Sequence, residues 1–431
     1  MLELFYLYEV GEMEMVLSNK VFRSSLKMPP EEVKEVLNKK INEEKENVKK
    51  NRTPESIKFE ETLLNGHIHL NKDKVNVVSL FSGAGGLDLG VELASVSAKY
   101  GYEKAYNAFK NKKDFKSLCT EINLLYSNDI FGAANKSYAS NVGDGSSFVQ
   151  DSRDIRSVYS FPQSDLMLGG FPCPGFSAAG PRLLDDPRNF LYTHYIRALM
   201  ESKPAFFIAE NVKGLMTMAK GQVLKQITED FSAAGYQVVA NLVNAKDYGV
   251  PQSRERVFIV GIRNDIVQKY HLSYEVPIPT NGEGKDPYVT LKDAIGDLPQ
   301  NPDDVFDSDY SSMYMSRNRK RGWNEQSFTI QASGRQAPQY PGGEPMKKVS
   351  KDHWEFTGNL NRRLSVREVA RIQTFPDWFK FSDGDKRNVS RNHKLNEQYK
   401  QIGNAVPVIL AEKMSRSILK FLEEHPEIRV G

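Results

Sequence analysis

The sequence contains very little cysteine. Only Cys119 and Cys173 occur among its 431 residues, so a framework of disulfide bonds is excluded and a reducing, cytoplasmic location is expected. No apolar run is long enough to cross a bilayer, and the N-terminus lacks the charged region, apolar core and small-residue cleavage site of a secretion signal. We therefore expect no membrane partner.

The chain also carries little excess charge of either sign. Its formal net charge is +3, so a nucleic-acid partner would have to bind a local basic patch rather than the molecule as a whole. The length allows two or three domains. We expect no bound metal ion.

Residues 1–72 have the character of an appendage. Pro29 and Pro30, followed by two glutamates, are typical of a helix start. Through residue 50, apolar side chains recur at helical spacing among lysines, glutamates and asparagines. The pattern predicts a solvated amphipathic helix docked on the main domain, with a regulatory or dimerising role as the alternative.

A β-rich run at residues 75–80 leads directly into a glycine-rich turn at residues 81–90. A strand, a glycine-rich turn and a helix open a nucleotide-binding unit, because glycines let backbone N–H groups approach a ligand closely. Asp88 stands where a dinucleotide fingerprint would have its third glycine. The segment favours a ligand without a pyrophosphate, with a purely structural turn as the alternative.

Acidic residues follow the next expected strands. Residues 124–127 form a strand pattern that ends beside Asp129, the place where such folds hold a ribose hydroxyl. Asp154 precedes a further strand. Residues 98–121 are rich in lysine and predict a helical surface insertion, to which we assign no role.

Cys173 lies at the centre of a turn, residues 169–177, that follows a short apolar run. Pro172 and Pro174 fix the backbone on either side, so the sulfur is held in place. A strand that delivers one side chain to the open end of a sheet suits a nucleophile. A small cysteine packed beneath a loop is the alternative.

Polar side chains also follow two later strands. Glu210 comes directly after an apolar run at residues 205–209. Its carboxyl is therefore expected at a strand tip, partly desolvated, with the raised pKa that a general acid requires. Arg254 and Arg256 fall on one side of an extended segment. They suit a clamp for an anion or a base edge, and equally ordinary surface charge.

Residues 265–358 break the α/β pattern, because they are rich in proline, glycine, serine, asparagine and tyrosine. Arg317, Arg319 and Arg335 lie there among aromatic side chains, a mixture that suits phosphate contacts and base-edge reading. A solvated basic loop is the alternative. From residue 359 the chain returns to the main pattern and ends in a helix with an apolar face.

Six segments resemble, in order, motifs of the DNA cytosine-5 methyltransferase family. They are residues 81–86, 170–173, 210–212, 252–256, 363–368 and 399–407, within a resemblance that covers residues 73–431. Residues 328–330 also resemble the threonine-containing core of that family's target-recognition domains. The sequence departs from the family pattern at one position, because Pro174 follows Cys173 where the family usually has glutamine. We expect this proline to affect the motion of the loop that carries the cysteine.

The resemblance implies an α/β fold, namely a Rossmann-like S-adenosylmethionine-dependent methyltransferase with a doubly wound mixed sheet and a smaller, irregular, β-rich target-recognition domain. The implied parts are an N-terminal extension, a catalytic domain, a target-recognition domain and a return to the catalytic domain, at residues 1–72, 73–264, 265–358 and 359–431. S-adenosylmethionine would be the methyl donor and S-adenosylhomocysteine the product. The implied cofactor-binding residues are Phe81, Gly83, Gly85, Gly86, Leu87, Asp129, Ile130, Asp154, Ile155, Pro172, Asn404 and Val406.

For catalysis, the resemblance implies a Cys173 thiolate that adds to C6 of cytosine, with Glu210 at N3. Arg254 would hold the O2 side of the ring, beside Arg256. The base must leave the duplex, with residues 180–189 closing behind it. The residues expected to contact DNA are Ser177, Arg188, Arg317, Arg319, Thr329 and Arg335.

The implied partner is double-stranded DNA, with a short GC-rich target of the GGCC or GG-x-CC kind. A cognate restriction endonuclease is implied without a stable complex, and a monomer is expected. The alternatives are a tRNA cytosine-5 methyltransferase of the same fold and a catalytically silent DNA-binding regulator. The Cys-Phe-Thr signature of the tRNA-directed relatives is absent, and the intact Cys173, Glu210 and Arg254 argue against a silent regulator.

Overall fold

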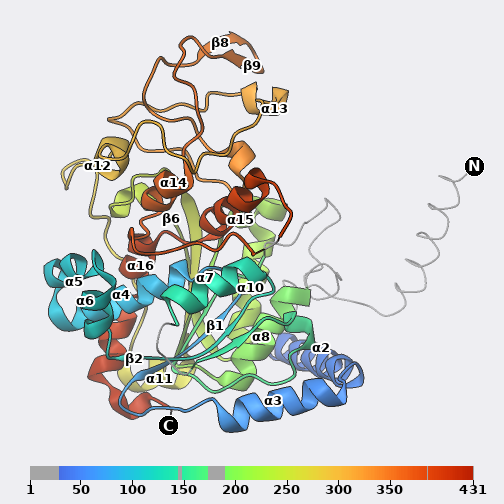
Figure 1. Ribbon diagram of the computed structural model, residues 1–431. Helices are drawn as coiled ribbons and strands as arrows, with labels where there is room; N and C mark the ends of the chain where they lie inside the picture. The colour runs from blue at the N-terminus through green and yellow to red at the C-terminus, as the bar shows by residue number, and fades with distance from the viewer. Residues whose placement is uncertain (1–28, 144–147, 173–189, 386, 431) are drawn as a thin grey trace, which may run out of the picture.

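The computed structural model describes residues 29–143, 148–172, 190–385 and 387–430. Cys173, Pro174, Ser177 and Arg188 lie outside the described residues. A seven-stranded sheet in the order β3-β2-β1-β4-β5-β7-β6 forms the centre of the larger unit (Figure 1). Its strands are β1 (Val75–Leu80), β2 (Ile122–Asn128), β3 (Val149–Asp151), β4 (Leu166–Gly169), β5 (Phe206–Val212), β6 (Tyr236–Asn244) and β7 (Glu255–Arg263).

The first five strands are parallel, and β7 is antiparallel to both of its neighbours. Parallel strands are covered on both faces, which is why β4 and the first four residues of β5 read as continuous apolar runs. Successive side chains alternate between two cores: in β5, Phe206 and Ile208 belong to one cluster and Phe207 and Ala209 to the other. The sheet is thus doubly wound and mixed, as the sequence predicts.

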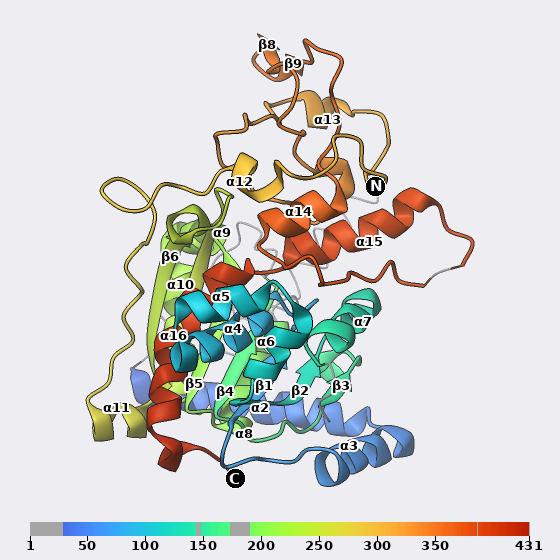
Figure 2. The same ribbon diagram turned by 60° about the vertical axis from the view of Figure 1, so that its left-hand side comes forward.

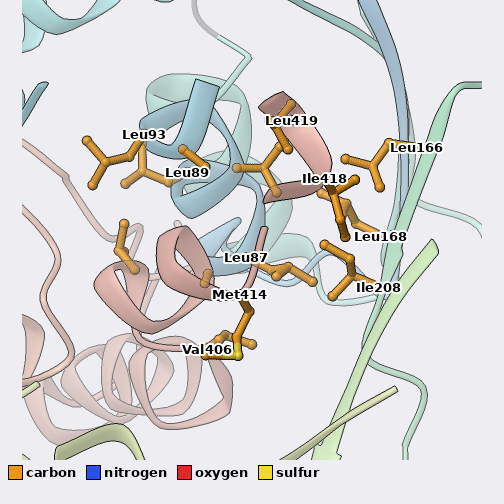
Figure 3. Close-up of a cluster of buried hydrophobic side chains, with 14 of the residues drawn as sticks. Leu87, Leu89, Leu93, Leu166, Leu168, Ile208, Val406, Met414, Ile418 and Leu419 are labelled. Carbon is orange, nitrogen blue, oxygen red and sulfur yellow. The ribbon is translucent and has the colours of Figure 1, made fainter. Parts of the chain in front are cut away.

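One face of the sheet is covered by α4 (Gly86–Tyr100) and α16 (Val408–Glu424), whose leucines, isoleucine and methionine surround β4 and β5 in Figure 3. The two helices touch closely at Gly90, where an added Cβ would lie 2.3 Å from the Cβ of Ala411. The predicted insertion is helical: α5 (Tyr102–Phe109) packs on α4, and α6 (Lys112–Leu118) packs on α5. The helix α7 (Gly132–Asn141) follows β2.

The opposite face is covered by α8 (Phe190–Ser202) and α10 (Gln222–Ala233), with the short α9 (Gly214–Thr217) between β5 and α10. The N-terminal extension adds α2 (Pro30–Lys50) and α3 (Pro54–Gly66). The predicted amphipathic helix is confirmed, because α2 buries Val33, Leu37, Ile41 and Val48 and packs on α8 and α10. Both views place α2 and α3 at the end of the molecule away from the smaller unit (Figures 1 and 2).

The smaller unit is irregular and lies above the sheet, with its helices α14 and α15 on the side that faces the sheet (Figure 2). The helix α11 (Asn264–Tyr270) precedes this unit. The helices and strands of the unit itself are α12 (Leu291–Ile295), α13 (Ser312–Met315), β8 (Lys347–Ser350), β9 (His353–Glu355), α14 (Val366–Ile372) and α15 (Arg391–Asn404). Regular strand pairing in this described part is limited to the β8–β9 hairpin, beside a few isolated bridges. Its apolar cluster runs from Leu291 to Ile402 and includes α14 and α15, so the core of this unit continues past residue 358.

No helix in the described ranges has both the length and the apolar character needed to cross a membrane.

Candidate active site

A cavity of about 610 Å³ opens at the carboxyl ends of β1, β2, β4 and β5. It lies where the chain order reverses between β1 and β4, the switch point at which open α/β sheets bind ligands. All but one of the residues predicted to bind a cofactor line this cavity; they are Phe81, Gly83, Gly86, Leu87, Asp129, Ile130, Asp154, Ile155, Pro172, Asn404 and Val406.

The exception is Gly85, which does not line the cavity. Gly85 adopts the left-handed conformation with φ +87°, and an added Cβ would lie 2.6 Å from Cγ2 of Val142. The glycine is therefore required by packing beneath the turn. Gly83 has φ +54° and open space where a Cβ would be, so it leaves room on the cavity side.

Asp129 ties the end of β2 to the glycine-rich turn. Its Oδ2 accepts a hydrogen bond from the Gly83 amide at 2.8 Å, and its Oδ1 accepts one from the Phe131 amide at 2.7 Å. Burial raises the pKa of this carboxyl, while these two amides favour the charged form. An acceptor is thus fixed at the cavity wall with an orientation set by the backbone.

A neighbouring part of the cavity wall comes from the loop after β3, which is bonded to the end of β2. Asp154 caps the short 3-10 turn η2 (Ile155–Ser157), where its side chain accepts from the Arg156 amide. The hydrogen bond to the Arg156 side chain, Nη2 to Oδ2 at 2.5 Å, lowers the pKa of Asp154. Ile130 and Ile155 supply apolar surface on either side, and 67% of Ile130 is exposed.

The inner end of the cavity is formed by Glu210 at the end of β5 and the turn that follows β4. Gly170 faces this carboxyl, since an added Cβ would lie 3.6 Å from Glu210 Oε2. Asn211 holds the turn by donating from Nδ2 to the Phe171 carbonyl at 3.0 Å. This turn leads directly into Cys173, so the described backbone brings the start of the cysteine turn beside Glu210.

Glu210 is buried and pairs with Arg256, whose Nε lies 2.9 Å from Glu210 Oε1. Burial raises the pKa of Glu210, although the nearby Arg256 and Arg254 favour its charged form. The pKa of Glu210 is therefore shifted upward, as the sequence predicts for a general acid at the end of a strand.

Arg254 is near enough to favour the charge on Glu210, but it does not line the cavity and its guanidinium bonds elsewhere, so the structure does not place it at the base as expected. It is 1% exposed, and its guanidinium donates to the carbonyls of Ile330, Gly403 and Ala405 at 2.9, 2.8 and 3.1 Å. Burial lowers the pKa of Arg254 to about 9, so it remains charged at neutral pH. Alternation along an extended segment cannot reveal that the first arginine bridges three distant segments. Among the residues that the structure describes, Glu210 forms its ion pair with Arg256.

Sequence reasoning missed two residues near the site. Lys400 lines the cavity, with its Nζ 4.2 Å from the centre of the Phe131 ring, and it precedes Asn404 by one helical turn of α15. Gln252 accepts from the Ile330 amide at 2.8 Å and donates to Gln373 Oε1 at 2.8 Å. The helical spacing of Lys400 and Asn404 is the one signal that could have identified the lysine.

The residues predicted to contact DNA divide into two groups. Arg317 and Arg335 are exposed, and Thr329 is half-buried with its hydroxyl donating to the Ser253 carbonyl at 2.8 Å. Arg319 is a correction: it is buried, donating from Nε to the Tyr314 carbonyl at 3.0 Å and from Nη2 to the Gln336 side chain at 2.8 Å. Its guanidinium is therefore used within the smaller unit.

A family model described as C-5 cytosine-specific DNA methylase matches residues 75–420. The chain belongs to the C-5 cytosine-specific DNA methylase family. It is 53% identical over 401 residues to the type II methyltransferase M.BspRI of Lysinibacillus sphaericus, covering 92% of this chain and 91% of that protein. It is 54% identical over 373 residues to the type II methyltransferase M.BsuRI of Bacillus subtilis, covering 84% of each. It is therefore a DNA cytosine-5 methyltransferase.

A solved structure supports the fold. The crystal structure of the S. pombe Dnmt2 methyltransferase matches with a TM-score of 0.51 and 18% identity, over 81% of this chain and 99% of that one. The family and fold imply S-adenosylmethionine as the methyl donor. The cavity fits that group, because a fixed carboxylate at Asp129 suits ribose hydroxyls and the apolar Ile130 and Ile155 suit an adenine ring. No cluster of three metal-ligating side chains occurs among the residues that the structure describes.

Proposed function

We propose that this methyltransferase moves a methyl group from S-adenosylmethionine to C5 of a flipped-out cytosine in a short GC-rich duplex target, through a covalent bond between Cys173 and C6. The modification would protect host DNA from a cognate restriction endonuclease. The observation that carries the proposal is the buried Glu210–Arg256 pair beside the turn that leads to Cys173, at the inner end of the cavity.

The chain's own residues account for activation of the base. Cytosine C5 is a poor nucleophile, so the Cys173 sulfur adds at C6 while Glu210 shares its proton with N3. Burial raises the pKa of Glu210, which favours its protonated form relative to an exposed carboxyl. Arg256 orients the carboxyl through its 2.9 Å contact and carries a charge that favours the electron-rich ring at O2. When bound, S-adenosylmethionine supplies an electrophilic methyl group to C5. Loss of the C5 proton and departure of the sulfur then restore the aromatic ring.

The rest of the cavity suits donor binding. Asp129 would hold the ribose hydroxyls, with its orientation set by the Gly83 and Phe131 amides. The wall formed by Asp154 and Ile155 would hold the adenine, and Asn404 lies opposite. Because these groups line the same cavity as Glu210, donor and base would meet inside the protein.

Such a buried site cannot act on a base stacked in a duplex, so the target cytosine must be extruded. Ser177 and residues 180–189 are the segment proposed to close behind it. Arg317 and Arg335 are exposed on the smaller unit and available for phosphate or base contacts, and Thr329 lies beside the segment that carries Arg254 and Arg256.

The experiment measures transfer of labelled methyl from S-adenosylmethionine to duplex DNA, followed by bisulfite mapping of a treated plasmid to identify the target sequence. Cys173→Ala should abolish transfer and leave S-adenosylhomocysteine binding intact. Cys119→Ala is the matched control, because burial raises the pKa of the Cys119 thiol and the residue lies away from the cavity lining. Transfer to tRNA only, or transfer that persists in Cys173→Ala, would overturn the proposal.

A further inference from the structure

The N-terminal extension reaches the cavity through one buried carboxylate. Glu60 on α3 is 3% exposed, and its two oxygens bind three groups from elsewhere in the chain. Oε2 accepts from the Arg52 guanidinium, while Oε1 binds Arg153 Nη1 at 3.1 Å and the Tyr159 amide at 2.8 Å. The helical pair α2–α3 is thereby fastened to the loop that follows β3.

The network continues from Arg153 into the sheet. Arg153 binds Asp151, the last residue of β3, with Nη2 2.6 Å from Oδ2 and Nε 2.9 Å from Oδ1. Tyr126 donates to the same carboxylate at 2.7 Å, and the Arg153 carbonyl accepts from the Asn128 side chain at 2.9 Å. Both ends of Arg153 are therefore fixed, its side chain by carboxylates and its carbonyl by β2.

The next residues along the chain, Asp154 and Ile155, form the cavity wall proposed to hold the adenine. The far side of their loop is also held, because Arg197 of α8 donates to the Val158 and Tyr159 carbonyls at 2.5 and 2.7 Å. Glu60 binds this loop from the extension at Arg153 on one side and at Tyr159 on the other, while Arg52 and Phe59 add ring contacts to the same two residues.

We propose that α2–α3 is a clamp that fixes the cofactor wall, with Glu60 as its positioning residue. The inference rests on the proposed binding of S-adenosylmethionine in the cavity. Two carboxylates, Glu60 and Asp151, balance two guanidiniums, Arg52 and Arg153. Removing the Glu60 charge leaves an excess positive charge in a largely buried network, and the amide nitrogen of a glutamine can only donate where a carboxylate oxygen accepted from a guanidinium. The loop then loses the geometry that Asp154 and Ile155 need toward the adenine.

The test titrates S-adenosylhomocysteine into the full-length protein by calorimetry for the wild type, Glu60→Gln, Glu60→Asp and Glu44→Gln. The control, Glu44, is a buried carboxylate on α2 of the same helical pair, where it lies 3.6 Å from Lys40 Nζ and 4.0 Å from His194 Nε2. It probes docking of the helices without a direct bond to the loop, although its neighbour His194 accepts from Arg197 at 3.3 Å. Steady-state kinetics separate the KM for S-adenosylmethionine from the KM for DNA and from kcat.

Glu60→Gln should raise the Kd for S-adenosylhomocysteine roughly 3- to 30-fold, with Glu60→Asp between it and the wild type. The KM for S-adenosylmethionine should rise with it, and the KM for DNA should stay unchanged because the extension lies away from the smaller unit (Figure 1). Glu44→Gln should bind as the wild type does.

An unchanged Kd in folded Glu60→Gln, or an equal rise in Glu44→Gln, would overturn the inference. If Glu60→Gln does not fold, Glu60→Asp decides: a Kd above the wild-type value supports the clamp, and an unchanged one overturns it. Failure of the wild type to bind S-adenosylhomocysteine would instead overturn the proposed function, so the two failures are distinguishable.

Discussion

The contrast between the two arginines yields the sharpest prediction. Arg254→Met removes a buried guanidinium that joins the carbonyls of Ile330, Gly403 and Ala405. The Ala405 carbonyl keeps a second donor, Gln373 Nε2, at 3.1 Å. The other two carbonyls lose this donor, at about 1–3 kcal/mol each for a buried unsatisfied group. We therefore expect the free energy of unfolding to fall by about 2–6 kcal/mol, a large part of the stability of a typical domain.

The assay is urea-induced unfolding followed by circular dichroism, with methyl transfer measured on the same samples. Arg256→Met is the matched control from the same segment. It deprives Glu210 of its 2.9 Å partner, but that carboxyl can take up a proton, so stability should change little while transfer is lost. An Arg254→Met protein that unfolds at the wild-type urea concentration would refute the assignment of Arg254 to structure.

Three further predictions concern other parts of the molecule. Burial raises the pKa of Glu210. At a pH between the ordinary carboxyl pKa and this raised pKa, the native state therefore holds a proton that the unfolded chain has lost, so the free energy of unfolding should fall as the pH rises through this window. Urea unfolding at stepped pH should show that fall, and Glu210→Gln should flatten it. Gly90→Ala should lower stability by about 1–3 kcal/mol in thermal unfolding, since the added Cβ would lie 2.3 Å from that of Ala411. Arg335→Gln should weaken DNA binding and reduce its salt slope by roughly one if the exposed guanidinium contacts a phosphate, as measured by fluorescence anisotropy.

Each of these has a contradicting outcome. An unaltered pH slope in Glu210→Gln would mean that the carboxyl is charged in the native state across the window. Gly132→Ala is the control for Gly90, because no atom lies within 4 Å of its added Cβ. Equal losses in both glycine variants would show that the loss does not come from the contact with Ala411, because Gly→Ala at a compatible backbone position stabilises through the unfolded chain. An unchanged salt slope in Arg335→Gln would remove that residue from the DNA surface.

Local patterns predicted much of the fold. The strand at Val75–Leu80, the helix that buries Val33 and Leu37, and the glycine-rich turn follow from periodicity and turn chemistry over a few residues. These features depend on near neighbours, so the sequence carries them directly. The cavity wall was also predicted in large part, because parallel strands bring their carboxyl ends to one edge.

Long-range contacts were beyond those patterns. Arg254 and Arg256 have equivalent positions in an extended segment, yet one bridges Ile330 to α15 and the other binds Glu210. Arg319 has the sequence context of a DNA contact but bonds to Tyr314 and Gln336 instead. Which surface an arginine faces depends on segments that pack against it from far along the chain.

By itself, then, the sequence determined the class of chemistry, because the acid at the end of β5, the cysteine turn and the glycine-rich loop are local and come in a recognisable order. Tertiary structure decided which arginine pairs with Glu210, which one bonds to distant carbonyls, and that Glu60 of the N-terminal extension pairs with Arg153 beside the cavity wall. Those outcomes depend on burial and on ion pairs between residues many positions apart. A buried charge takes its role from the partners that the fold supplies.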